Sequence, residues 1–197
     1  MATSSVDICN SALNIIGASN IISLDEDSKA GRICKQRYPN VRDSVFRSHP
    51  WNCLVNRVQL TADTTNPTFE FQYQYTLPAD PFCLRVIKLE FLDTVYRIEG
   101  RKLLTNESQL KLIYVGRNEN VSDYDMLLSE SIAAAMASDL AYPLVGSNSL
   151  AQQMYDMYQR KLSEARFVDS TEGTPAQTEN LSQAGQVQAD YFLLSRY

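Results

Sequence analysis

The sequence lacks the residue clusters on which most metal and cofactor sites depend. Its 197 residues include one histidine, one tryptophan, seven glycines and four cysteines. No two cysteines form a CxxC pair, so a zinc site is not expected. The glycines are isolated from one another, which argues against a glycine-rich phosphate loop. We therefore expect neither a metal nor a small-molecule cofactor.

Long apolar runs are also missing. No stretch reaches the roughly 20 apolar residues that a membrane span needs, and the first residues do not resemble a signal peptide. We expect a chain without a membrane anchor that folds in a reducing cytoplasm, with its cysteines as free thiols. The net charge is -5 and the pI about 4.9. This balance disfavours a nucleic-acid-binding regulator, since such proteins are usually basic.

Few residues remain as candidates for catalysis. A serine–histidine–aspartate triad would have to use His49, which stands at a predicted helix end, where capping is the commoner role. Carboxylates are paired at Asp123 and Asp125 and grouped at positions 25–27. Both groups are typical of acids that stabilise a helix N-terminus. We expect no enzyme, and the alternative is a glycan or peptidoglycan hydrolase that uses two carboxylates.

Apolar residues recur at helical spacing in two predicted helices near the N-terminus. The first begins at Ser4 or Ser5 and ends at Gly17, where a positive φ is expected. The second follows a cap at Ser23 or Asp25. A short apolar connector joins the two helices.

The second helix keeps the phase of its apolar stripe through Pro39, so we predict one kinked helix rather than two. Pro50 stops this helix, and Trp51 follows as a large structural anchor. The opposite face is basic, which is more often a solvated or salt-bridged surface than a DNA contact. The basic residues of this face that are candidates for contacting DNA are Lys29, Arg32, Lys35 and Arg42.

The middle of the chain has strand-like patterns. Residues 69–76 alternate strictly between aromatic and polar side chains, which predicts a half-buried strand. A sheet core explains these aromatics better than stacking on bases or sugars does. Neighbouring short strands should pair antiparallel. The other predicted strands are 53–60, 82–91, 94–98, 102–105 and 110–115.

Two further helices are predicted after residue 120, beginning at Ser122 or Asp123 and at Ser147 or Asn148. The fold class is α+β, an antiparallel bundle of about four helices with an inserted small antiparallel β-sheet or sandwich and an extended C-terminal arm. The predicted parts are a helical domain (1–52 and 120–168), a β lobe (53–119) and the arm (169–197).

The arm differs in composition from the rest of the chain. Residues 169–190 contain no lysine, arginine or aromatic residue, so they cannot bury enough apolar surface to fold alone. The arm nevertheless ends in an apolar tip, which is either a hook for a partner or a frayed terminus. The candidate partner-binding residues of the tip are Tyr191, Phe192, Leu193, Leu194 and Tyr197.

Several short motifs follow one another in order. The first is an Asn-x-Ala-Leu-x-x-Ile-Gly helix that starts at Asn10, together with the Ile-x-Ser-Leu connector that starts at Ile21. A His-Pro-Trp-Asn corner begins at His49, and Tyr-x-Leu-Pro-x-Asp begins at Tyr75. Over most of residues 5–165 this pattern resembles the tail tubular protein A family, the head-to-tail adaptors of short-tailed bacteriophages.

The resemblance implies a viral structural protein. Similar proteins form a closed ring of twelve subunits beneath the portal, continue the DNA channel used in genome ejection and dock the tail nozzle. The implied partners are the portal protein, the nozzle protein and further copies of the chain, with DNA passing without sequence-specific binding. The resemblance also implies a place in the virion tail, after synthesis in the bacterial cytoplasm, and an apolar tip that binds the portal or a neighbouring subunit.

Overall fold

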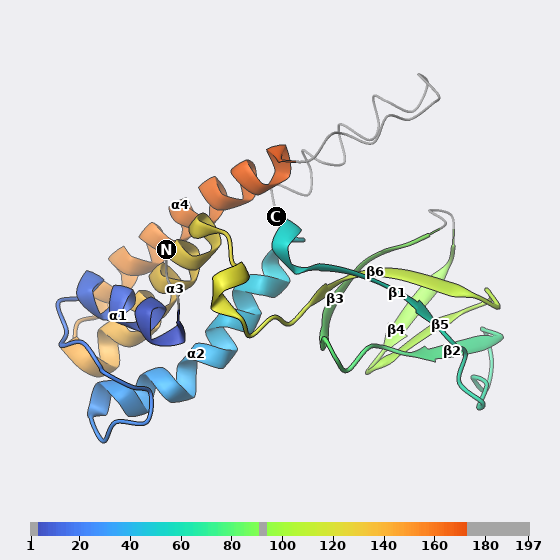
Figure 1. Ribbon diagram of the computed structural model, residues 1–197, viewed down its shortest axis with the longest axis horizontal. Coiled ribbons are helices and arrows are strands. Elements are labelled where there is room, and N and C mark those ends of the chain that lie inside the picture. Colours follow the sequence, from blue (N-terminus) through green and yellow to red (C-terminus); the bar gives the residue numbers. More distant parts are fainter. Residues whose placement is uncertain (1–3, 91–93, 173–197) are drawn as a thin grey trace. The chain divides into compact units, whose positions relative to one another are not determined.

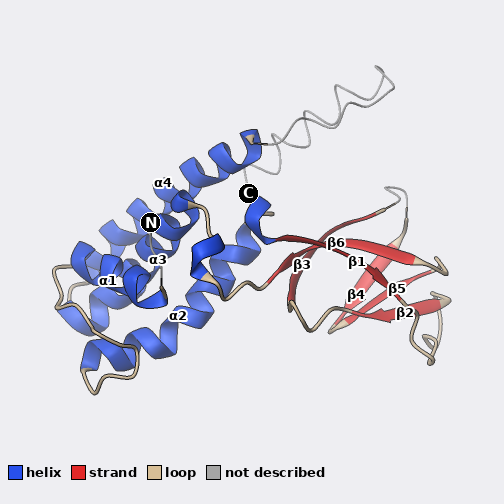
Figure 2. Cartoon of the chain, viewed as in Figure 1, coloured by secondary structure: helices blue, strands red, loops and turns tan. Residues whose placement is uncertain are grey.

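The structure, a computed structural model, describes residues 4–90 and 94–172 (Figure 1). Over these residues the chain has four α-helices and six β-strands, which confirms the predicted α+β class. Contacts divide the chain into two units. The helical unit combines Met1–Arg42 with Asn120–Tyr197, and the β unit is Asp43–Glu119. All the strands belong to the β unit (Figure 2).

Helix α1 spans Ser5–Ile15 and is capped by Ser4. The Ser4 hydroxyl accepts a hydrogen bond from the Asp7 N–H, and the Asp7 carboxylate accepts one from the Ser4 N–H. This reciprocal capping box satisfies two backbone donors. Gly17 follows the helix with φ of +72°, the conformation that the sequence predicted there. The buried residues of α1 are Ile8, Cys9, Ala12 and Leu13.

Helix α2 spans Lys29–Ser48 and begins later than predicted. The Ser28 hydroxyl accepts a hydrogen bond from the Gly31 N–H at 2.9 Å, so the predicted cap at Ser23 or Asp25 was wrong. The reason is local, because the Ser23 hydroxyl accepts a bond from the Asp25 N–H instead. That contact closes a turn before the helix starts.

Pro39 lies inside α2, and the helix continues through it as the phase of the stripe predicted. The helix also crosses from one unit to the other, because the division falls between Arg42 and Asp43. The sequence placed this boundary after residue 52. The second boundary of the division follows Glu119.

Helix α3 spans Met126–Val145, and most of its central residues are buried. The Asp125 carboxylate caps it by accepting hydrogen bonds from two N–H groups of the first turn. The predicted start at Ser122 or Asp123 was early, because a short 3-10 helix occupies Val121–Asp123. Small side chains allow neighbouring helices to approach closely. The buried alanines are Ala133, Ala134, Ala135, Ala137 and Ala141.

Helix α4 spans Asn148–Thr171 and is capped by Ser147. It packs along α3, and α1 also packs against α3. The predicted end at Ala165 or Arg166 was wrong, because Asp169 is buried and the last two hydroxyls donate to carbonyls three residues earlier. The first residues assigned to the arm are therefore helical. Residues 173–197, which include the predicted tip, lie outside the described residues.

The β unit contains two three-stranded antiparallel sheets. One has the order β1-β6-β3 and the other β2-β5-β4 (Figure 1). The strands are β1 (Val55–Leu60), β2 (Tyr73–Thr76), β3 (Cys83–Leu89), β4 (Tyr96–Glu99), β5 (Lys102–Thr105) and β6 (Leu110–Gly116). Residues from both sheets form one buried cluster. Its members are Tyr75, Leu77, Cys83, Leu89, Leu103, Leu110, Leu112 and Tyr114.

Five of the six strands lie within one or two residues of their predicted ranges, but the strand predicted from Phe69 is shorter. Phe69 is 79% exposed. A strand extends only as far as its backbone hydrogen bonds to a partner strand. The partner strand β5 ends at Thr105, opposite Tyr73, the first residue of β2. Beyond that point the Asn106 side chain accepts the Gln72 N–H at 3.0 Å. A side chain thus replaces the ladder.

Candidate functional site

Asn10, the first residue of the first motif, ties α1 to the connector that follows it. Its amide Nδ2 donates to the Ile21 carbonyl at 2.9 Å, and its Oδ1 accepts from the Ile21 N–H at 2.8 Å. A side-chain amide suits this place because it offers a donor and an acceptor side by side. Ala12, Leu13 and Ile16 of the same motif are buried. The motif therefore specifies a helix fastened to its own connector.

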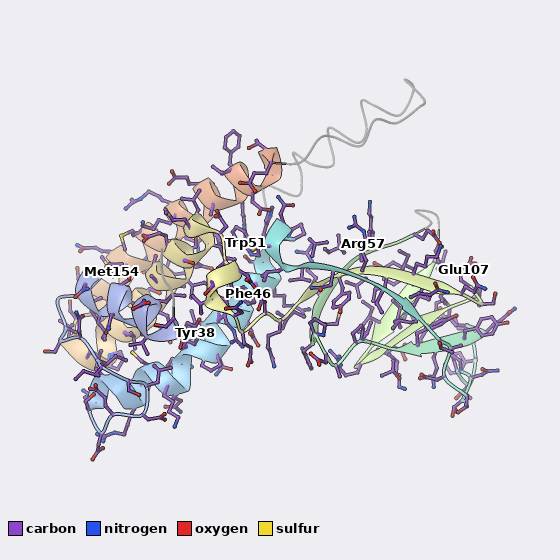
Figure 3. All side chains as sticks on the ribbon, viewed as in Figure 1. Tyr38, Phe46, Trp51, Arg57, Glu107 and Met154 are labelled. Carbon is purple, nitrogen blue, oxygen red and sulfur yellow. The ribbon has the colours of Figure 1, made fainter. Side chains whose placement is uncertain are left out.

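The His-Pro-Trp-Asn corner is centred on Trp51, which lies just beyond the end of α2 (Figure 3). Trp51 is 0% exposed, as its predicted role as an anchor requires. Its Nε1 donates to the Val45 carbonyl at 3.1 Å, which satisfies the one polar atom of the indole. The His49 ring meets the indole edge-on, with 4.9 Å between the ring centroids. His49 is thus part of a buried aromatic contact.

The third motif forms a turn that is held by an arginine from another part of the chain. Arg101 donates to the Cys83 carbonyl at 2.8 Å and to the carbonyls of Leu77 and Pro78. Its guanidinium lies 4.0 Å from the centre of the Phe82 ring. The planar fork of an arginine can satisfy several carbonyls at once, which a lysine cannot do with the same geometry. Arg101 could not be predicted from the sequence, because no spacing pattern links it to this turn.

Tyr75, the first residue of the third motif, also bonds to backbone. Its hydroxyl donates to the Glu107 carbonyl at 2.6 Å, and burial is the main reason that its pKa is raised. In all three motifs, then, a side chain fastens a backbone segment. We call these three places the joints, centred on Asn10, Trp51 and Arg101.

The paired carboxylates considered for catalysis are engaged at helix ends. Asp125 caps α3, and the Asp123 carboxylate accepts a hydrogen bond from Asn120 Nδ2 at 3.0 Å. These contacts are what the helix-terminus interpretation predicts. Neither carboxylate is placed by the structure across a cleft from the other.

The acidic group at positions 25–27 precedes α2 and is similarly engaged. Asp25 forms an ion pair with Lys35 at 2.6 Å, and Asp27 forms one with Arg32. The Glu26 carboxylate accepts the Ile22 N–H at 2.7 Å. Its pKa is lowered mainly by a hydrogen bond from the Ser28 hydroxyl. This group stabilises the start of α2 and its connector.

The basic face of α2 is largely neutralised within the helical unit. Besides the ion pairs of Arg32 and Lys35, Lys29 donates to the Pro143 carbonyl and Arg37 pairs with Asp139 at 2.5 Å. These contacts are those of a salt-bridged face. The structure does not test a role in a DNA channel, which stays a prediction for Lys29, Arg32 and Lys35.

Arg42 is an exception among the channel candidates. It is only 6% exposed, and its guanidinium lies 5.8 Å from the centre of the Tyr38 ring. It is therefore not on an exposed basic surface of the chain. Its position on the helix turns Arg42 toward the core. From the sequence alone it groups with the basic residues of the opposite face.

A different surface carries the cations that sequence reasoning missed. Arg57 on β1 (Figure 3) and Lys88 on β3 both lie opposite Ile113 of β6. Among the described residues neither has an ion-pair partner. Two strand spacings separate them by about 10 Å. The alternation of apolar and polar side chains in residues 55–60 and 83–89 could have indicated which side chains face outward. Only the pairing of the strands in the sheet brings Arg57 and Lys88 together.

A pocket of about 570 Å³ lies beside the third joint, lined by residues that include Asp80, Phe82 and Arg117. The Arg117 guanidinium lies 4.7 Å from the centre of the Phe82 ring, on which Arg101 also packs. Arg117 forms an ion pair with Asp43 at 2.6 Å. Both arginines are thus committed to structural contacts, and the pocket contains no further strong ligand-binding pattern.

Cys9 and Cys34 are buried free thiols in the helical unit, as predicted. A hydrogen bond with Cys34 and then burial raise the pKa of Cys9 far above its ordinary value. Cys9 therefore remains a neutral thiol at physiological pH. Such a thiol packs as a small apolar side chain.

No protein-family model matches the chain, and no curated protein matches its sequence. Within residues 4–90 and 94–172 no three histidine, cysteine or acidic side chains are grouped to hold a metal ion. The helices in this part of the chain are too short or too polar to cross a membrane.

Proposed function

We propose that this chain is the structural head-to-tail adaptor of a short-tailed bacteriophage. Twelve copies would form a ring that joins the portal to the tail nozzle and continues the DNA channel during genome ejection. The protein would act in the virion tail, after synthesis in the host bacterial cytoplasm, and would need no cofactor. The observation that carries the proposal is the order of the motifs from Asn10 to Asp80.

The roles of the motif residues support a structural function. In an enzyme, the side chains of a family pattern converge on a reacting atom. Here the pattern residues fasten backbone at separate joints, through Asn10, Trp51 and Tyr75. An adaptor needs its chain held in one shape, because shape and buried area do its work.

Exposed apolar side chains on the helical unit suggest where partners would pack. We propose that the four helices form an antiparallel bundle whose outer surface meets neighbouring subunits and the portal, while the β unit faces the nozzle. Large apolar side chains left in solvent often mark such contacts. On α3 and α4 they are Met126, Tyr142, Val145, Tyr155 and Phe167.

The C-terminal arm is the proposed attachment device. Its tip, Tyr191, Phe192, Leu193, Leu194 and Tyr197, would bind the portal or a neighbouring subunit. Ordering the polar residues before it costs conformational entropy. The buried apolar area of the tip, worth about 25 cal/mol per Å², would offset that cost.

The channel wall would contact DNA through charge alone. Lys29, Arg32 and Lys35 remain candidates, although the ion pairs of Arg32 and Lys35 reduce the net charge of that face. Arg57 and Lys88 are further candidates because they lack such pairs among the described residues. Contacts of this kind read phosphates and not bases.

The experiment is binding of the full chain to purified portal rings, measured by co-sedimentation. We expect the chain to sediment with the rings, and the chain truncated after Glu172 to lose most of this binding. A chain that never joins portal rings would contradict the proposal. Turnover of purified cell-wall glycan that Asp123→Asn or Asp125→Asn abolishes would favour the hydrolase instead.

A further inference from the structure

Strand β4 forms one edge of the β2-β5-β4 sheet, and all four of its residues are exposed. The register aligns Ile98 with Leu103 of β5 and Leu103 with Tyr75 of β2. Residues aligned in this way share one face of a sheet. Tyr75 and Leu103 are 0% exposed on that face, whereas Ile98 is 43% exposed. The inner face of the sheet is therefore covered at two strands and uncovered at the third.

The buried cluster of the β unit explains this difference. It contains residues of β2 and β5 but none of β4. Tyr96 has the same orientation as Ile98, because side chains two positions apart in a strand share a face. Val95, just before the strand, is 72% exposed. The apolar side chains at this rim of the core are thus not covered by any of the described residues.

The other edge of β4 is equally unprotected. No backbone hydrogen bond joins β4 to a described residue other than its partner in β5. Edge strands are usually guarded by charges, because open edges attract other strands. The two charges of β4, Arg97 and Glu99, lie on the opposite face from Ile98, and Arg97 is held there by an ion pair with Glu70 at 3.1 Å. This combination favours an extended apolar segment that adds to the sheet.

The chain itself carries such a segment. Residues 173–197 lie beyond the described part of α4 and end in Tyr-Phe-Leu-Leu-Ser-Arg-Tyr. Fully extended, they would reach about 80 Å. Aromatic residues favour strands, and the polar residues before the tip supply a tether rather than a competing core.

We propose that β4 is the seat for the C-terminal tip, residues 191–197, of a neighbouring copy of this chain. The tip adds as a fourth strand beside β4 and covers Tyr96 and Ile98. The inference rests on the proposed function, since a ring supplies the neighbouring copy. Each subunit then offers one seat and one tip, and such head-to-tail contacts close into a ring.

The test uses the full chain with Phe192→p-benzoylphenylalanine, a photo-crosslinking residue of similar shape. Equal amounts of ¹⁴N-labelled and ¹⁵N-labelled chains are assembled on portal rings and irradiated. Mass spectrometry then identifies the cross-linked peptides. We expect cross-links to the peptide that contains β4, with mixed isotope labels. Cross-links to the portal, to another element, or only within one chain would overturn the inference.

A variant of the seat gives a second readout. Ile98→Asp should lower the cross-linking yield about tenfold or more, because the tip would bury a charge without a partner. The matched control is Ile22→Asp, which changes an exposed apolar side chain in the connector before α2 and should leave the yield unchanged. If Ile98→Asp does not fold, Leu193→Asp tests the same contact from the tip. Equal yields in the seat and tip variants and the control would overturn the inference.

The two proposals can fail separately. If the chain joins portal rings but the cross-links lie elsewhere, the seat is wrong and the adaptor function stands. If the chain never joins portal rings, the adaptor function is wrong whatever the cross-links show.

Discussion

The two units of the chain bury their apolar residues in different ways. In the helical unit, most of the central residues of α3 are buried, and α1 and α4 both pack against it. In the β unit, two sheets share a cluster that ends before β4. In the helical unit the central helix is covered by its neighbours. In the β unit, Ile98 at the rim of the core is left exposed. The difference suggests that the β unit is built to be completed by another segment.

Both units hold many of their cations in ion pairs. Examples are Arg37 with Asp139 and Lys161 with Glu130 in the helical unit, and Lys102 with Asp63 and Lys111 with Glu90 in the β unit. Arg57 and Lys88 of the β unit have no such pair among the described residues. Exposed ion pairs contribute little stability, about 0–1 kcal/mol each. Their value in the helical unit is that they fix side chains and reduce the net charge of a face.

The largest expected effect comes from the joint at Trp51. Trp51→Ala should lower the free energy of unfolding by about 3–5 kcal/mol, because it leaves a large cavity and removes the bond to Val45. Thermal and denaturant unfolding measure this loss. Trp51→Phe is the control, since it keeps an aromatic ring and should cost less. An unchanged melting temperature for Trp51→Ala would mean that the indole is not buried in solution.

The corresponding joint of the helical unit is smaller. Asn10→Ala should cost about 1–3 kcal/mol, because the N–H and the carbonyl of the buried Ile21 lose their partner. Urea unfolding measures the change. Asn14→Ala, on the same helix but exposed, is the control and should cost much less. Equal effects of the two substitutions would show that the bonds to Ile21 do not stabilise the fold.

The close packing of α3 predicts a further difference between the units. Ala134 is 0% exposed, so Ala134→Leu should cost about 1–3 kcal/mol through overpacking. The exposed rim of the β unit should tolerate a larger residue, and Ile98→Phe should change the free energy of unfolding by less than about 0.5 kcal/mol. Both values come from denaturant unfolding. If the two substitutions cost the same, the rim at β4 is not open.

The smallest effect concerns pH and the ion pair of Asp63 with Lys102. A hydrogen bond from Lys102 is the main reason that the pKa of Asp63 is lowered. A carboxyl whose pKa is lower in the folded chain than its ordinary value of about 3.9 stabilises the fold above that value. The contribution is lost as the pH falls from about 4 through the lowered pKa.

Asp63→Asn should therefore cost up to about 1 kcal/mol at pH 7, a value discounted for solvent screening. The cost should disappear in strong acid. Unfolding at a series of pH values measures it. The control is Asp27→Asn in the helical unit, whose side chain is 94% exposed and whose loss should be near zero at every pH. A cost of Asp63→Asn that does not change with pH would contradict the assignment.

The sequence predicted the N-terminal caps of α1 and α4 correctly. Caps such as Ser4 and Ser147 act within one turn, so local spacing reveals them. The end of α4 was missed because polar residues up to Thr171 bond back to their own helix. The strand predicted from Phe69 was too long because its length depends on the partner strand β5, which lies far along the chain.

For the candidate sites too, local features could be predicted from the sequence, and features that depend on distant segments could not. The burial of Trp51 followed from its size and from the corner that holds it. Arg101 was missed because its three carbonyl partners come from a turn that is distant in sequence. The exposed rim at β4 was also invisible, because the strand pattern of residues 94–98 does not reveal whether a second sheet covers it.

The most direct test of the account is the mass of the complex that the full chain forms with portal rings, measured by native mass spectrometry. The account predicts one dominant species that contains twelve copies of the chain on each portal ring. It also predicts that this species is lost when residues 173–197 are removed. A portal ring that carries no copies, or a variable number unaffected by the truncation, would contradict the central claim that the chain works by assembling into a ring.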